Sequence, residues 1–210
     1  MKKNIKTGLS LFIAMLFAQL NYAQTVTIGK QVWTTKNLNV DKFRNGDPIP
    51  QAKTDEEWER ASDNNQPAWC YHDNDTNNGE KYGKLYNWYA VNDPRGLAPL
   101  GYHIPTDAEW SILTDYLGAE GATGGKMKAT SGWRAPNKEA SNSSGFSGLP
   151  GSCRIYNGTF TVSGKGGYWW SSSEYYKFHA WNLYLGYDDG NVTRHYTNEG
   201  CGFSVRCLRD

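Results

Sequence analysis

The strongest apolar run of the chain lies at its N-terminus. Residues 9–20 are almost entirely apolar, three lysines precede them, and no acidic residue occurs before Asp41. A basic start, a short apolar run and a small residue at the cleavage position are typical of a secretory signal peptide, here cleaved after Ala23. The run is shorter than the roughly 18–20 apolar residues of a membrane span, and no cysteine follows closely enough for lipid attachment. We therefore expect residues 1–23 to direct export and residues 24–210 to form one domain that is secreted, periplasmic or held at the cell surface.

The first half of the mature chain alternates short strand and helix patterns. Apolar positions on both sides of Gly29-Lys30 predict a hairpin over residues 26–33. Residues 68–71 have the composition of a strand, and apolar residues spaced as on one helix face predict a short helix over 84–92.

Two capping boxes mark further helices. Thr54 with Glu57, and Thr106 with Glu109, have the spacing of this motif. In it, the threonine hydroxyl accepts from the backbone N–H three residues later, and the glutamate side chain accepts from the backbone N–H of the threonine. Trp110 begins the apolar face of the second helix, which Gly118 ends. The expected helices cover residues 54–62 and 106–117.

From Gly124 onward the chain is rich in glycine, serine and asparagine, with strand-like runs between turns. The expected strands are 168–173, 180–187, 192–196 and 203–208, with a turn at 188–191. In the last of them, alternation places Phe203, Val205 and Cys207 on one face and Ser204, Arg206 and Leu208 on the other. Helices and strands do not alternate regularly, which argues against a parallel sheet. The pattern predicts a loop-rich α+β domain with two or three short helices and an antiparallel sheet built mostly from the C-terminal half.

Composition and charge narrow the classes of partner. Without the leader lysines the chain has 19 basic and 21 acidic residues, so it is nearly neutral and carries no basic cluster for nucleic acid. No other apolar stretch could span a membrane. Aromatic residues reach 14%, with nine tryptophans, which is enough to fill a core, to line a binding face, or both.

Four cysteines in an exported chain predict disulfides. If residues 201–207 form one strand, Cys201 and Cys207 are roughly 20 Å apart, beyond the ~7 Å limit for a bridge. Two pairings remain: Cys70–Cys207 with Cys153–Cys201, or Cys70–Cys201 with Cys153–Cys207.

Motifs of catalysis are missing from the sequence. The four histidines fall in different segments without metal-ligand spacing, and Leu149 replaces the glycine that a nucleophile elbow would need after Gly145-Phe-Ser-Gly148. We therefore expect no catalytic residues, no resident metal and no cofactor.

One oxygen-rich loop resembles a calcium loop in part. Asp73, Asp75 and Asn77 occupy alternate positions, but Gly79 is one position late and Lys84 stands where a bidentate acid is required. The favoured interpretation is a solvated loop whose side chains cap their own backbone, with calcium binding as the alternative.

The clearest candidate ligand face lies in the C-terminal strands. Trp169 and Trp170 are consecutive in a predicted strand, so one ring points to each face of the sheet, and Trp181 and Tyr187 follow in the next strand. Exposed flat rings there could stack on sugars or peptides. Trp181-Asn182 also resembles part of a lectin calcium motif, although Leu183 replaces its acid.

Five runs in order resemble the Fibrobacter succinogenes major paralogous domain family, which occurs in exported bacterial proteins and has no assigned biochemical function. These runs are Trp69–Tyr71, Gly83–Ala90, His103–Trp110, Tyr168–Tyr175 and Gly202–Asp210. Ala98 stands where that family often has cysteine, and Cys153 and Cys201 look like additions to its pattern. The resemblance therefore favours a Cys153–Cys201 bridge.

A more distant similarity concerns formylglycine-generating enzymes. Ile104–Trp110 is similar to their helix start, and Gly202–Arg206 is similar to their closing strand. This similarity implies a C-type-lectin-like fold. Those enzymes use a pair of copper-binding cysteines before the final strand, whereas residues 171–198 contain no cysteine.

Together these features predict an exported, non-catalytic binding or adhesion module for carbohydrate or extracellular protein. The alternatives are an oxidase related to the formylglycine generators and a calcium-dependent lectin.

Overall fold

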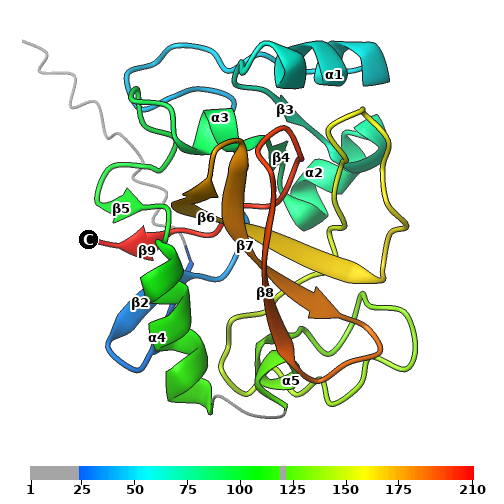
Figure 1. Cartoon of the computed structure of the whole chain (residues 1–210). Helices are drawn as coiled ribbons and strands as arrows, with labels where there is room; N and C mark the ends of the chain where they lie inside the picture. The colour runs from blue at the N-terminus through cyan, green and yellow to red at the C-terminus, as the bar shows by residue number, and fades with distance from the viewer. Residues whose placement is uncertain (1–23, 119–121) are drawn as a thin grey trace, which may run out of the picture.

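Two antiparallel sheets and a two-stranded ribbon carry the fold of the computed structural model, which describes residues 24–118 and 122–210 (Figure 1). One sheet has the strand order β1-β2-β9-β5, the other has the order β6-β7-β8, and β3 pairs with β4. Their bounds are β1 (Thr25–Ile28), β2 (Gln31–Thr34), β3 (Trp69–Cys70), β4 (Leu85–Tyr86), β5 (Tyr102–His103), β6 (Gly166–Tyr176), β7 (His179–Gly186), β8 (Val192–Asn198) and β9 (Leu208–Arg209). The expected α+β class with antiparallel sheets is confirmed, but the N-terminal hairpin contributes half of one sheet.

The described residues contain five short α-helices and one 3₁₀ turn, more than the two or three helices expected. They are α1 (Asp55–Asp63), α2 (Asn77–Tyr82), α3 (Trp88–Val91), α4 (Asp107–Leu117), α5 (Thr123–Met127) and η1 (His72–Asn74). The helix expected over 84–92 begins only at Trp88. Leu85 and Tyr86 are instead extended, because they pair with β3 and the Tyr86 amide donates to the Phe203 carbonyl at 2.9 Å. A distant partner thus overrides the local helical spacing.

Both capping boxes form as predicted. The Thr54 and Thr106 hydroxyls accept from the amides of Glu57 and Glu109, whose carboxylates reach back to the cap backbone. The apolar face of α4 is buried, and Trp110 packs on Trp33 of β2 with ring centroids 4.6 Å apart. The capping motif therefore also docks α4 against the N-terminal sheet.

The C-terminal segment is extended but does not form the single strand expected over 203–208. Gly202 pairs with Arg154, Phe203 with Tyr86, and Ser204 with Trp169, whereas only β9 at the end joins a named sheet. Each backbone group finds a different neighbour, so no continuous ladder forms. The segment runs through the middle of the molecule, and every residue from 201 to 208 is buried.

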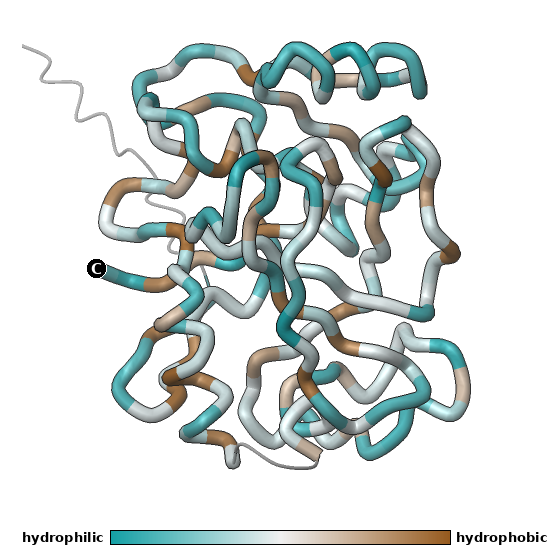
Figure 2. Tube along the Cα trace, in the orientation of Figure 1, coloured by the Kyte–Doolittle hydropathy of each residue, from teal (hydrophilic) through white to brown (hydrophobic). Residues whose placement is uncertain are grey.

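The core is aromatic rather than aliphatic. Figure 2 shows only short brown stretches separated by pale and teal ones, so no element is hydrophobic throughout. Trp33, Trp58, Trp110, Trp169 and Trp170 are nonetheless at most 1% exposed. Indole and phenol rings have intermediate hydropathy but bury large areas, which explains how a polar-looking chain encloses a core.

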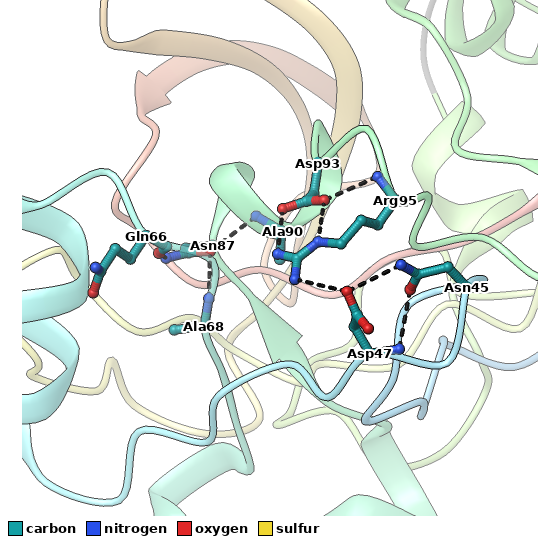
Figure 3. A network of polar contacts seen from close by, with 8 residues as sticks. All are labelled: Asn45, Asp47, Gln66, Ala68, Asn87, Ala90, Asp93 and Arg95. Atoms are coloured by element: carbon teal, nitrogen blue, oxygen red, sulfur yellow. Dashed lines mark hydrogen bonds and ion pairs between the residues drawn. The ribbon is translucent and has the colours of Figure 1, made fainter.

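Asn87 organises the junction between β3, β4 and α3 (Figure 3). Its Oδ1 accepts from the amides of Ala68 and Ala90, and its Nδ2 donates to the Gln66 carbonyl at 2.7 Å. In the same view Arg95 makes two 2.8 Å bonds to Asp93 and reaches Asp47 at 3.4 Å. Asn87 supplies hydrogen-bond partners to loop backbone groups, and Arg95 connects neighbouring loops. In a more regular fold, strand ladders would supply such hydrogen bonds.

Four buried cationic side chains also supply hydrogen bonds to irregular backbone segments. Lys84, Lys128, Arg154 and Arg206 are each no more than 5% exposed, and each donates to backbone carbonyls of irregular segments. Lys128 Nζ alone donates to the carbonyls of Lys138, Gly186 and Asp189. Buried carbonyls must be paired, so these cations hold loops that lack strand partners.

His103 links α4 to Asp210 at the C-terminus. Its ring nitrogens lie 2.8 Å from Asp210 and 2.9 Å from Glu109. Partial burial opposes the charged ring, but the bonds to the two carboxylates outweigh it and raise the pKa of His103 above its ordinary value of 6.5.

Because the folded-state pKa is raised, this contribution to stability is fully present below the unfolded-state pKa near 6.5. It is lost as the pH rises through the higher folded-state pKa. We expect Asp210→Asn to lower the pKa of His103 in an NMR titration and to flatten this part of the pH–stability curve, while leaving the α4 cap intact. An unchanged pKa in that variant would contradict the assigned pairing.

Candidate binding face

The face of β7 that carries Trp181 changes from covered to open along the strand. Leu183 and Leu185 point to the same side as Trp181 and are fully buried in the cluster that includes Trp110 of α4. Trp181 lies one step beyond this cover, and its paired residue on β8 is the exposed Tyr196. The sheet thus extends past the helix that covers it and presents side chains to solvent.

Three rings form a cluster on this open part, which we call the aromatic face: Tyr175, Trp181 and Tyr196. Tyr175 and Tyr196 stack with centroids 4.0 Å apart, and Trp181 meets them edge-on at 4.9 and 5.9 Å. Tyr175 and Tyr196 remain 47% and 51% exposed. The register shifts of β6 after Trp170 bring Tyr175 into this position.

Charged and polar side chains border the rings. The Arg194 guanidinium lies 4.8 Å from the centroid of the Trp181 ring and is held by two bonds to Asp107 in the first turn of α4. His179 lies 6.2 Å from the Tyr196 ring. The start of α4 therefore positions a cation over the indole.

Trp181 differs from the other tryptophans in its indole N–H. The remaining eight each donate this proton to a protein acceptor: Trp33, Trp58, Trp69, Trp88, Trp110, Trp133, Trp169 and Trp170. Trp181 Nε1 has no acceptor among the described residues. Partly exposed and unbonded, it is the one indole available to an external acceptor.

The other residues expected on the ligand face lie elsewhere. Trp169 and Trp170 are both 0% exposed, because the sheet is covered on its two sides at this point: Trp169 bonds Asn37, and Trp170 bonds the Tyr86 carbonyl. They are core residues, and that part of the prediction is wrong. Asn182 is buried, and Tyr187 lies beyond the opposite end of β7. Of the residues predicted for the ligand face, only Trp181 belongs to the aromatic face.

Tyr175 and Tyr196 were missed by sequence reasoning. Tyr175 falls within the Tyr168–Tyr175 run, but its strand was expected to end at residue 173. Its approach to Tyr196 depends on the register shifts in β6, which the sequence pattern does not reveal.

All four cysteines are buried free thiols in the structure, so the predicted disulfides are not formed. Cys70 packs beside Trp58 and Leu85, whereas Cys153, Cys201 and Cys207 belong to a different cluster. Arg154 and Gly202 exchange both backbone bonds, which places Cys153 and Cys201 on the same side of two adjacent segments. Burial raises the pKa of Cys201 to about 12, so its thiol is protonated and unreactive.

The oxygen-rich loop caps itself, in agreement with the favoured interpretation. Asp75 Oδ1 accepts from both the amide and the side-chain nitrogen of Asn77 at 2.9 Å, and Asp73 faces His72 at 3.5 Å. Across residues 24–118 and 122–210, no three histidine, cysteine or acidic side chains are grouped to hold a metal ion.

The expected signal peptide, residues 1–23, lies outside the described residues. Within the part of the chain that the structure describes, no helix has the length and apolar character needed to cross a membrane.

Comparison with known proteins identifies the domain. No curated protein and no solved structure matches the chain. The model of the Fibrobacter succinogenes major domain matches residues 26–209, nearly the whole length beyond the expected leader. The chain therefore belongs to the Fibrobacter succinogenes major domain family.

Proposed function

We propose that this protein is an exported, non-catalytic binding or adhesion module that recognises carbohydrate through the aromatic face of Tyr175, Trp181 and Tyr196. The observation that carries the proposal is the state of Trp181. It is the one tryptophan without a protein acceptor for its N–H among the described residues, and it lies in an exposed cluster with two stacked tyrosines. Every other indole serves the architecture.

The arrangement fits a sugar better than a protein surface. Ligand sites combine apolar area with a few placed polar groups, and here flat rings lie beside Arg194, His179 and the free indole N–H. A sugar ring offers C–H groups to stack on the aromatic plane and hydroxyls to accept from the indole and guanidinium. Recognition of an extracellular protein would use a broader apolar patch than three rings provide.

We further propose that the fold is C-type-lectin-like, as the similarity to formylglycine-generating enzymes implies. The support is its α+β class, its short helices and its long irregular connections. Fold alone carries no activity, so the function rests on the aromatic face.

A glycan array followed by calorimetry tests this function. We expect the protein to bind at least one class of glycan. Trp181→Ala and Tyr196→Ala should each weaken that binding about five- to thirtyfold, because each removes ring area and cluster geometry worth about 1–2 kcal/mol. Neither variant should unfold, since both side chains are partly solvated.

Tyr156→Ala is the matched control. The exposed fraction of Tyr156 is 49%, similar to the 47% of Tyr175, but Tyr156 belongs to none of the ring pairs of the aromatic face. Its removal should leave glycan affinity unchanged. Full-affinity binding by Trp181→Ala, or an array on which no glycan is bound above background, would contradict carbohydrate recognition by this face.

A further inference from the structure

A cleft of about 470 Å³, lined mostly by residues with polar or charged side chains, lies apart from the aromatic face. Lys36, Asn39, Lys81, Ser147 and Arg206 contribute to its lining, together with the backbone at Gly83. Its volume is within the range of small-molecule sites, roughly 300–1,000 Å³. Two of the family-like runs, 83–90 and 202–210, meet here, although the proposed carbohydrate site uses neither.

The wall of the cleft needs glycine at position 83. Gly83 has φ +74°, and a Cβ there would lie 2.7 Å from the Leu38 carbonyl oxygen. The segment that precedes β4 can therefore pass close to Leu38 only without a side chain. This close approach fixes one side of the cleft.

Arg206 is the buried charge of the site. It is 1% exposed, and its Nε donates to Asn37 Oδ1 at 2.7 Å. Nη1 donates to the Thr34 and Phe146 carbonyls, and Nη2 donates to the Ser147 carbonyl at 3.1 Å. Four of its five N–H groups are thereby used, and one on Nη2 has no acceptor among the described residues.

All four acceptors of Arg206 are neutral, and no described carboxylate forms an ion pair with it. The other buried cations differ: Arg154 pairs with Asp55 at 2.9 Å, Lys84 has Asp41 nearby, and Lys128 has Asp189 and Glu139 nearby. A buried charge without a counter-ion is costly. Burial lowers the pKa of Arg206 to about 9, which still leaves the guanidinium charged at neutral pH.

The rim of the cleft adds positive charge. Lys36 and Lys81 are exposed and line it, against one acidic residue, Glu80. The lining thus carries three positive charges and one negative charge, in a protein that is close to neutral as a whole. Such a local excess attracts anions.

We propose that this cleft binds a small ligand through an oxyanion group, a carboxylate or a phosphate, which supplies the negative charge that Arg206 lacks. The free N–H of Arg206 contacts the oxyanion at the wall, and Lys36 and Lys81 hold it from the rim. The proposal is independent of the carbohydrate function of the aromatic face.

Calorimetry and thermal unfolding with two probes, sodium glucuronate and inorganic phosphate, test it at constant ionic strength. We expect saturable binding of at least one probe and a rise in Tm of about 3–6 °C at a concentration ten times its Kd, relative to chloride. Tighter binding of glucuronate assigns the cleft to acidic sugars or organic acids, and tighter binding of phosphate assigns it to phosphorylated molecules. Saturable binding of neither probe overturns the proposal.

Charge-matched variants locate the binding. Lys36→Gln with Lys81→Gln should weaken the bound probe at least about tenfold without changing Tm in chloride, because both side chains are exposed. Lys30→Gln with Lys42→Gln removes the same charge at exposed positions outside the cleft and should leave Kd unchanged. Equal weakening by both pairs would show non-specific attraction and overturn the site. Trp181→Ala should not affect anion binding, so failure of one site is distinguishable from failure of the other.

Discussion

Replacing Trp170 with alanine is expected to lower the free energy of unfolding by about 3–5 kcal/mol, the usual cost of truncating a buried tryptophan. Its ring is 0% exposed and packs on Phe203 at 4.3 Å, and its indole N–H donates to the Tyr86 carbonyl at 2.8 Å. The substitution leaves a cavity and removes one of the two hydrogen bonds to the Tyr86 carbonyl, which keeps the bond from the Phe203 amide at 3.0 Å. Thermal or urea unfolding should show a Tm lower by about 6–20 °C for a domain of this size.

Trp181→Ala is the natural comparison for this variant. It removes the same side chain from the next strand, where the indole is partly solvated and makes no hydrogen bond to the described protein. We expect its unfolding free energy to fall by no more than about 1 kcal/mol, while its glycan binding weakens as described above. If Trp170→Ala were as stable as Trp181→Ala, the division into core and surface tryptophans would be wrong.

Arg154→Met is expected to lower the free energy of unfolding by about 2–6 kcal/mol, because two buried carbonyls lose their donor at about 1–3 kcal/mol each. The guanidinium donates to the Gly158 carbonyl at 2.7 Å and to the Ala52 carbonyl at 3.1 Å, and it packs between Trp58 and Phe160. Methionine retains much of the volume but offers no donor. Urea unfolding measures the loss, and circular dichroism reports on α1, whose Asp55 also binds this arginine.

Asp55→Asn separates the charge of this ion pair from the buried bonds. Asp55 is 56% exposed, so solvent screens the pair, and the amide oxygen can still accept from Arg154. We expect a loss of at most about 1 kcal/mol. A loss in Asp55→Asn as large as the loss in Arg154→Met would show that the ion pair, and not the carbonyl bonds, holds this region.

Sequence patterns predicted elements whose stabilising contacts are local. The hairpin at Gly29-Lys30 and the helices after Thr54 and Thr106 form where expected, because a turn or a capping box is completed by residues two to four positions away. Secondary-structure predictions were wrong where distant segments supply the hydrogen-bond partners. Tyr86 is extended instead of helical because Phe203, more than 100 residues later, bonds to it.

In the candidate sites, too, the sequence pattern indicated residues, whereas contacts with distant segments decided their burial and pairing. Trp181 was expected on a ligand face and lies on the aromatic face, but nothing in the strand pattern distinguished it from Trp169 and Trp170. The difference comes from what covers each ring: Trp169 lies in the cluster that includes Trp110 of α4, and Trp170 packs on Phe203 of the C-terminal segment, whereas Trp181 stays partly exposed. Arg206 was expected to share a face with Ser204 and Leu208, but its lack of a counter-ion could be recognised only in the assembled cleft.

The α+β class, the family and the starts of α1 and α4 could be predicted from sequence, because these features depend on local spacing and on ordered motifs. Which tryptophans are core, which cations are paired and where the cleft lies became known only from the folded molecule, because burial and hydrogen-bond satisfaction depend on residues far apart in the chain. Trp169 bonds Asn37 across 132 residues, and Arg206 bonds it across 169.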